Sequence, residues 1–134
     1  MRRFSMMLIL AAAAPVAAFA QGAKPALYTE AQANAGAAVY TQTCAACHGS
    51  QLEGVAAPAL KGSVFGEMAT AQSLTVQTLL DVIANTMPQS DPGSLKPEDN
   101  AAVTAYILQQ NGYPAGTAPL ANGAAGMKDA KITP

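Results

Sequence analysis

Apolar residues recur every three or four positions in three segments of the chain, which is the spacing of one face of an α-helix. The pattern predicts helices over 30–43, 75–86 and 97–111. Their apolar faces carry, in chain order, Ala33, Gly36, Ala37 and Tyr40, then Val76, Leu79, Leu80 and Ile83, then Ala102, Val103, Tyr106 and Ile107. No apolar–polar alternation is long enough to predict a strand, so we expect an all-α protein.

The residues that flank these segments support the helix boundaries. Thr29 is a favourable N-cap for the first helix. The second helix should end before Met87, because a residue that precedes proline, here Pro88, is pushed out of the helical region. Pro97 suits the first position of the third helix, although Lys96 before it is a poor cap.

The segments between and after these helices are rich in glycine, proline and alanine. Residues 49–73 should form a long loop with at most a short helical turn near 64–69, because several glycines interrupt any regular pattern. A loop of that length in a small domain is normally functional. Residues 114–134 form a tail in which we expect neither helix nor strand, held to the surface by Leu120 and Ile132.

The first twenty residues have the pattern of a secretory signal peptide. An arginine pair precedes an apolar run, which ends in the small-residue sequence Ala18-Phe19-Ala20. We expect cleavage after Ala20, so that the mature chain begins at Gln21 and is exported to the periplasm. The alternative, an uncleaved membrane anchor, is disfavoured because the apolar run is short for a span of about 20 residues.

The composition argues against two classes of protein and indicates that the core has few large side chains. Of 134 residues, 51% are hydrophobic and 11% are charged, and the net charge is −1. Few charges argue against a disordered charged tail and against nucleic-acid binding, which needs a dense cluster of Lys and Arg. Aromatic residues make up 5% and tryptophan is absent, so the large side chains are too few for an ordinary core. Another group could therefore fill the centre.

Both cysteines and the only histidine lie within the five residues Cys44-Ala45-Ala46-Cys47-His48. C-x-x-C-H is the attachment signature of c-type haem. Two thiols at that spacing can add to the two vinyl groups of haem and form thioethers. The next residue then presents an imidazole to the iron.

Three other uses of these residues fit less well. A thioredoxin-type redox pair needs a βαβ context, which the helical pattern does not provide. A structural zinc ion usually takes four nitrogen or sulfur ligands, and the sequence has no fourth cysteine or histidine. A disulfide between Cys44 and Cys47 would leave His48 unexplained. We therefore expect one haem c, bound covalently through both cysteines.

The second axial ligand of a six-coordinate iron cannot be another histidine of this chain. Met87 is the favoured candidate because it follows a predicted helix, opens a loop and precedes Pro88. Met68 and Met127 are the weaker alternatives, since most methionines fill cores and the tail would lose more entropy on ordering.

Residues 29–113 resemble the class I c-type cytochromes. The resemblance lies in the first helix with Gly36 and Tyr40, in CAACHG, in Pro58-Ala59-Leu60, in Asn85-Thr86-Met87-Pro88 and in Ala105-Tyr106-Ile107-Leu108. It implies three main helices and loops wrapped around one haem, with the first and last helices crossing at a contact of glycine with aromatic residues. It also implies that the carbonyl of Pro58 accepts a hydrogen bond from His48, and that Leu60 packs on the haem.

The stretch 87–116 looks like a subset of these cytochromes that serve periplasmic dehydrogenases. We therefore expect residues 21–113 to be a one-electron carrier and not an enzyme. Its partners would be a dehydrogenase donor and an oxidase or another cytochrome as acceptor, met as a monomer in transient complexes. The alternatives are a fixed electron-transfer subunit of a dehydrogenase, with 114–134 docked on its partner, and a haem sensor or peroxidase with an open distal site.

Overall fold

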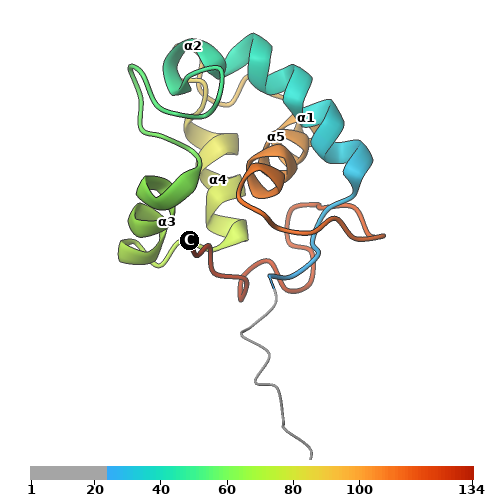
Figure 1. The fold of residues 1–134 in the computed structure, drawn as a ribbon. Helices are drawn as coiled ribbons and strands as arrows, with labels where there is room; N and C mark the ends of the chain where they lie inside the picture. The colour runs from blue at the N-terminus through green and yellow to red at the C-terminus, as the bar shows by residue number, and fades with distance from the viewer. Residues whose placement is uncertain (1–23) are drawn as a thin grey trace, which may run out of the picture.

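The computed structural model describes residues 24–134, which fold into five helices and no strand (Figure 1). The helices are α1 (Glu30–Thr43), α2 (Ala45–His48), α3 (Gly62–Ala71), α4 (Val76–Thr86) and α5 (Pro97–Gln110). Within this part of the chain, no helix is long and apolar enough to cross a membrane. The expected signal peptide and its cleavage after Ala20 lie outside the described residues.

The starts of the long helices follow from their local sequence. Thr29 caps α1 in a capping box with Gln32, and Thr75 caps α4 in a second box with Thr78. Pro97 occupies the first turn of α5, and Lys96 before it makes no side-chain cap. The three predicted helices are thus confirmed, each within about one residue of its expected bounds.

Helices α1 and α5 cross at a close backbone contact, as the resemblance implied. A Cβ atom at Gly36 would collide with the backbone carbonyl of Ala102, so only glycine fits there. The ring centroids of Tyr40 and Tyr106 lie 5.4 Å apart beside this contact, with the rings tilted by 52°. A tilted pair at this separation is a favourable aromatic geometry. The crossing fixes the frame on which the site is built.

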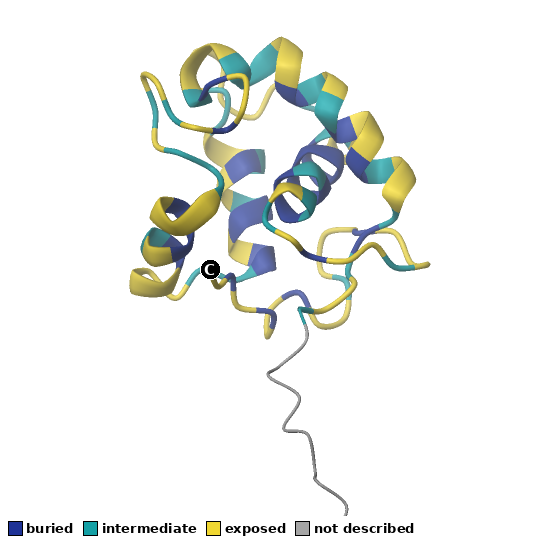
Figure 2. Cartoon of the chain, viewed as in Figure 1, coloured by how far each residue is buried: buried dark blue, intermediate teal, exposed yellow. Residues whose placement is uncertain are grey.

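The buried faces of α4 and α5 form the centre of the molecule, where Figure 2 shows dark blue on both helices. On α4 the predicted apolar stripe is buried throughout, from Val76 to Ile83. Among the described helices, α4 packs against α5 alone. Its other contacts come from segments without regular structure.

The expectation for 49–73 was wrong in extent, because α3 is a ten-residue helix and not a short turn. Phe65 and Ala69 are buried at i and i+4, and this burial outweighs the low helix propensity of glycine. Gly66 is required for packing, since a Cβ there would lie 2.7 Å from Cα of Pro134. That contact is distant in sequence and gives no local signal.

The C-terminal residues pack on the helices (Figure 1). We call residues 120–132 the C-terminal strap. Leu120 and Ile132, the two residues expected to hold the tail, are 2% and 1% exposed, and Met127 is fully buried. The strap contains no helix, and Lys131 forms an isolated antiparallel bridge with Thr75.

Candidate haem site

Cys44, Cys47 and His48 lie where α1 ends and the short helix α2 begins. Cys44 is the C-cap of α1 and the N-cap of α2, and His48 closes the α2 turn. Cys44 is half-buried, Cys47 is exposed, and both are free thiols. Burial raises the pKa of the Cys44 thiol, and the neighbouring Cys47 raises it further. One helical turn therefore presents two sulfurs and an imidazole to the same pocket.

The loop after His48 folds back over the motif and fixes the imidazole. Nδ1 of His48 lies 2.8 Å from the carbonyl oxygen of Pro58. That oxygen can only accept, so Nδ1 carries the proton and Nε2 keeps its lone pair for a metal. The return of the loop needs Gly49 and Gly54, which have φ of +86° and +81°.

The same loop is held by backbone hydrogen bonds to α2. The carbonyl of Cys47 accepts from the N–H groups of three successive loop residues, and the carbonyl of His48 accepts from Gly54 at 2.8 Å. The N–H of Leu60 donates to the carbonyl of Leu52 at 2.9 Å. These bonds bring Pro58 and Leu60 to the pocket wall.

Met87 reaches the same pocket from a distant part of the sequence, as the C-cap of α4. Its backbone N–H donates to the carbonyl of Ile83 at 3.2 Å, and the pocket wall beside it comes from α4 and α5. Neither alternative methionine lines this pocket: Met68 lies on α3, and Met127 is buried in the C-terminal strap. Met87 is thus the methionine that faces the same space as His48.

All six residues singled out in the sequence line one pocket: Cys44, Cys47, His48, Pro58, Leu60 and Met87. Its remaining walls are alanine, valine, leucine, isoleucine and Pro88, with Thr43 and Gln89 as the polar exceptions. None of the lining residues is an acid, lysine or arginine. This donor set fits haem c: two thiols for attachment, an imidazole and a thioether for the iron, and apolar walls for the porphyrin. Among residues 24–134, no group of three or more His, Cys, Asp and Glu side chains could hold a bare metal ion.

Two residues that support the site had no signal of that role in the sequence. The hydroxyl of Tyr40 donates to the carbonyl of Gly49 at 2.7 Å, directly after the motif. Asn111 donates to the carbonyl of Leu60 at 2.9 Å and accepts from the N–H of Gly62 at 3.2 Å. From the sequence, Asn111 is predicted only to end a helix, because its hydrogen-bond partners in the loop are about fifty positions away.

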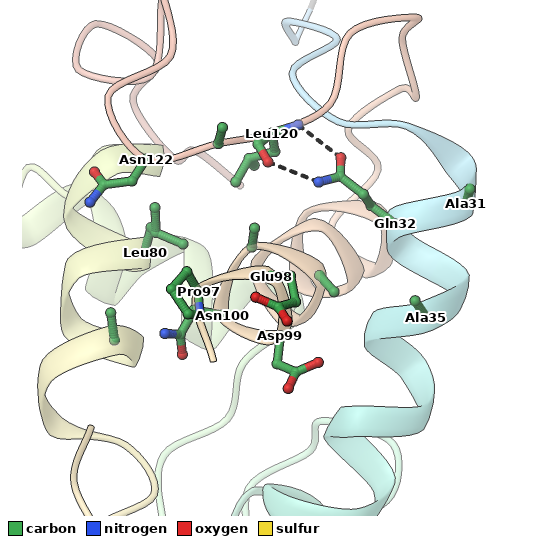
Figure 3. A pocket seen from close by; sticks show the side chains of 14 residues that line it. Ala31, Gln32, Ala35, Leu80, Pro97, Glu98, Asp99, Asn100, Leu120 and Asn122 are labelled. Carbon is green, nitrogen blue, oxygen red and sulfur yellow. Dashed lines mark hydrogen bonds between the residues drawn. The ribbon is translucent and has the colours of Figure 1, made fainter. Parts of the chain in front are cut away.

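A larger hollow of about 660 Å³ lies between α1, α4, the start of α5 and the strap (Figure 3). Its walls include Leu80, Leu120, Glu98 and Asp99. It contains no sulfur or imidazole, and none of the six candidate residues lines it. The candidate chemistry is therefore confined to the smaller pocket.

Comparisons with known proteins agree with this geometry. The family model described as cytochrome c oxidase, cbb3-type, subunit III matches residues 31–107. The structure of the sulfane dehydrogenase SoxCD from Paracoccus pantotrophus is similar, with 26% identity and a TM-score of 0.56 over 84% of this chain and 57% of that one. The thiosulfate dehydrogenase TsdBA from Marichromatium purpuratum, as isolated, gives 30% identity and a TM-score of 0.48 over 82% and 24%.

This chain spans less than two thirds of the length of either similar structure. Among curated proteins, none matches it.

Proposed function

We propose that this chain carries one electron at a time on a covalently bound haem c. The premise is that the chain belongs to the c-type cytochrome family described as cytochrome c oxidase, cbb3-type, subunit III. One observation carries this proposal: His48 and Met87, from distant parts of the chain, line the same apolar pocket as Cys44 and Cys47. When bound, the haem iron supplies a centre that alternates between two oxidation states.

In this proposal each site residue has a distinct role. Cys44 and Cys47 would hold the haem covalently through two thioether bonds. His48, through Nε2, and Met87, through its sulfur, would be the ligands of the iron. The carbonyl of Pro58 orients the imidazole and raises its basicity through Nδ1–H.

Two properties of the pocket suit electron transfer. With His48 and Met87 both bound to it, the iron would have no open position for a substrate. Thioether ligation and apolar walls both favour the reduced iron, because the oxidised centre carries more charge. The walls of this pocket carry no acid, whose negative charge would favour the oxidised iron and counter the effect.

The uncharged pocket rim favours transient, partly apolar contacts with redox partners. Val82 is 44% exposed on that rim and Val55, in the loop over the motif, is 74% exposed. Contacts of this kind suit a small interface without strong electrostatic steering. A periplasmic dehydrogenase would be the donor and a respiratory oxidase or cytochrome the acceptor, after export directed by residues 1–20.

A second candidate function is a fixed electron-transfer subunit of a dehydrogenase. It is favoured by the likeness to the structure of the sulfane dehydrogenase SoxCD, of whose longer chain this one covers 57%. The two functions differ in whether this chain stays with a partner during purification from its native source.

The proposal is tested on holoprotein made in a host with haem-ligation machinery. A carrier gives a one-electron redox titration and, in the reduced state, no carbon monoxide binding without denaturant. Ready carbon monoxide binding by the native protein would instead indicate an open distal site and a sensor or peroxidase. Size-exclusion chromatography of the natively expressed protein separates a free carrier from a fixed subunit.

A further inference from the structure

The C-terminal strap completes the first turn of α4, the helix that ends at Met87. The first N–H groups of a helix lack partners within the helix. In α4 the N–H of Val76 donates to the carbonyl of Ala130 at 2.9 Å, and that of Gln77 donates to the carbonyl of Met127 at 3.1 Å. The other two N–H groups without a partner in the helix backbone, those of Thr75 and Thr78, each donate to the hydroxyl of the other residue in the capping box. Two of the four exposed donors therefore depend on the strap.

The side chain of Gln77 stabilises this contact between the C-terminal strap and the start of α4. It is 7% exposed, although glutamine is mostly a surface residue. Its Nε2 donates to Oδ1 of Asn122 at 2.7 Å and to Oδ1 of Asp81 at 2.8 Å, and its Oε1 accepts from the N–H of Gly123 at 3.0 Å. All of its hydrogen-bonding groups are thus used, and two of the three bonds go to the strap.

The strap is held independently at both of its ends. Figure 3 shows Leu120 paired with Gln32 of α1: the Leu120 N–H donates to Oε1 at 2.8 Å, and Nε2 donates to the Leu120 carbonyl at 2.8 Å. At the other end the Ile132 N–H donates to the carbonyl of Leu74 at 2.8 Å. The buried Met127 side chain lies between them in the sequence. The strap therefore connects the start of α1 to the start of α4.

We propose that the C-terminal strap, through Gln77, positions Met87 as the distal ligand of the haem iron. This inference rests on the proposed function. In the described part of the chain α5 is the only helix that packs against α4, so the strap is its second attachment. An eleven-residue helix moves largely as one body, so loosening Val76 and Gln77 frees the far end where Met87 lies.

The consequence is an equilibrium between Met87 bound to the iron and Met87 released. An added ligand that needs the same position binds only the released form, and its apparent affinity scales with the fraction released. The strap lowers that fraction by holding α4. Gln77 is thus a positioning residue, and it does not line the haem pocket.

The test measures imidazole binding to the ferric holoprotein in wild type, Gln77→Leu and Tyr28→Phe. Gln77→Leu keeps an apolar stem and removes the bonds to the strap. Tyr28→Phe is the matched control, because it removes one buried hydrogen bond, from the Tyr28 hydroxyl to the Tyr113 carbonyl, away from α4. Met127→Ala serves as a second loosening variant, which leaves α4 itself unchanged.

For Gln77→Leu we expect imidazole to bind about fivefold more tightly, the factor that one ordinary buried hydrogen bond contributes to an equilibrium constant. Met127→Ala should shift the affinity in the same direction, and Tyr28→Phe should leave it unchanged. Equal affinity in wild type and both loosening variants, or an equal shift in all three variants, would overturn the inference. The far-red absorption of sulfur-ligated ferric haem, recorded on the wild type, separates the two proposals: its absence contradicts the ligand assignment itself.

Discussion

Nδ1 of His48 and the carbonyl oxygen of Pro58 lie 2.8 Å apart, joined by a loop that closes over the haem-binding motif. This contact determines the imidazole tautomer and therefore which nitrogen faces the pocket. The loop that carries Pro58 is anchored in turn by Asn111 at the end of α5. The proximal side of the site thus depends on a residue that is far from it in sequence.

Replacing Asn111 by alanine should destabilise the holoprotein. The change removes the bonds to the Leu60 carbonyl and the Gly62 N–H, and it costs about 1–2 kcal/mol in the free energy of unfolding. Guanidinium unfolding followed by circular dichroism measures the difference. Gln110→Ala, at an exposed neighbouring position, is the control, and an equal loss in both variants would argue against the anchoring role.

Removing the Met87 side chain should open the distal position while the haem stays attached through Cys44 and Cys47. In Met87→Ala we expect carbon monoxide binding by the reduced native protein. We also expect a fall in reduction potential on the order of 100 mV, within the roughly 0.8 V range that axial ligands span. Met68→Leu, which changes a methionine outside the pocket, should retain the wild-type spectrum and potential. Wild-type behaviour of Met87→Ala would show that another group ligates the iron.

The stability of the protein should fall at alkaline pH because of Tyr40. Burial raises the pKa of Tyr40 from 10.0 to about 12, with smaller contributions from Cys44, Tyr106 and Glu53. The folded protein therefore keeps a proton that the unfolded chain loses, so the stabilisation is complete below pH 10 and is lost as the pH rises toward 12. Tyr40→Phe should be less stable at pH 8 but lose less stability between pH 10 and 12. Parallel losses in the two proteins over that window would disprove the assignment.

A charge on the pocket rim should slow electron exchange. Val82 is 44% exposed on the rim, whereas Val64 is 65% exposed on α3 and does not line the pocket. We expect Val82→Glu to slow self-exchange between oxidised and reduced copies by about tenfold at low ionic strength, and Val64→Glu to leave it near wild type. Line broadening in nuclear magnetic resonance spectra gives the rate. Equal slowing by both substitutions would place the contact surface elsewhere.

The sequence predicted the features of this molecule that local chemistry determines. Helices α1, α4 and α5 follow from apolar spacing, and the close crossing of α1 and α5 at Gly36 was implied by the resemblance to the class I c-type cytochromes. The C-x-x-C-H motif and the Met87-Pro88 step located candidate residues on both sides of the pocket. Pro58 and Leu60 were predicted as site residues only from the resemblance to the class I c-type cytochromes.

The features that escaped prediction depend on contacts between distant residues. Helix α3 forms because Phe65 and Ala69 are buried, and Pro134 packs on Gly66. Gln77 binds strap residues about 45 positions away, the side chain of Asn122 and the backbone N–H of Gly123. Such bonds leave no periodicity in the chain, so the sequence predicted the attachment of the tail through Leu120 and Ile132 but not its contact with α4.

The central claim, one haem joined to Cys44 and Cys47, is tested most directly by the mass of the intact, acid-denatured protein. Denaturation breaks axial bonds to iron but leaves thioethers intact. The account predicts the mass of the chain plus one haem, and a Cys44→Ala/Cys47→Ala variant that carries none. A colourless wild-type protein with the mass of the bare chain, from a host that ligates haem to a control cytochrome, would contradict it.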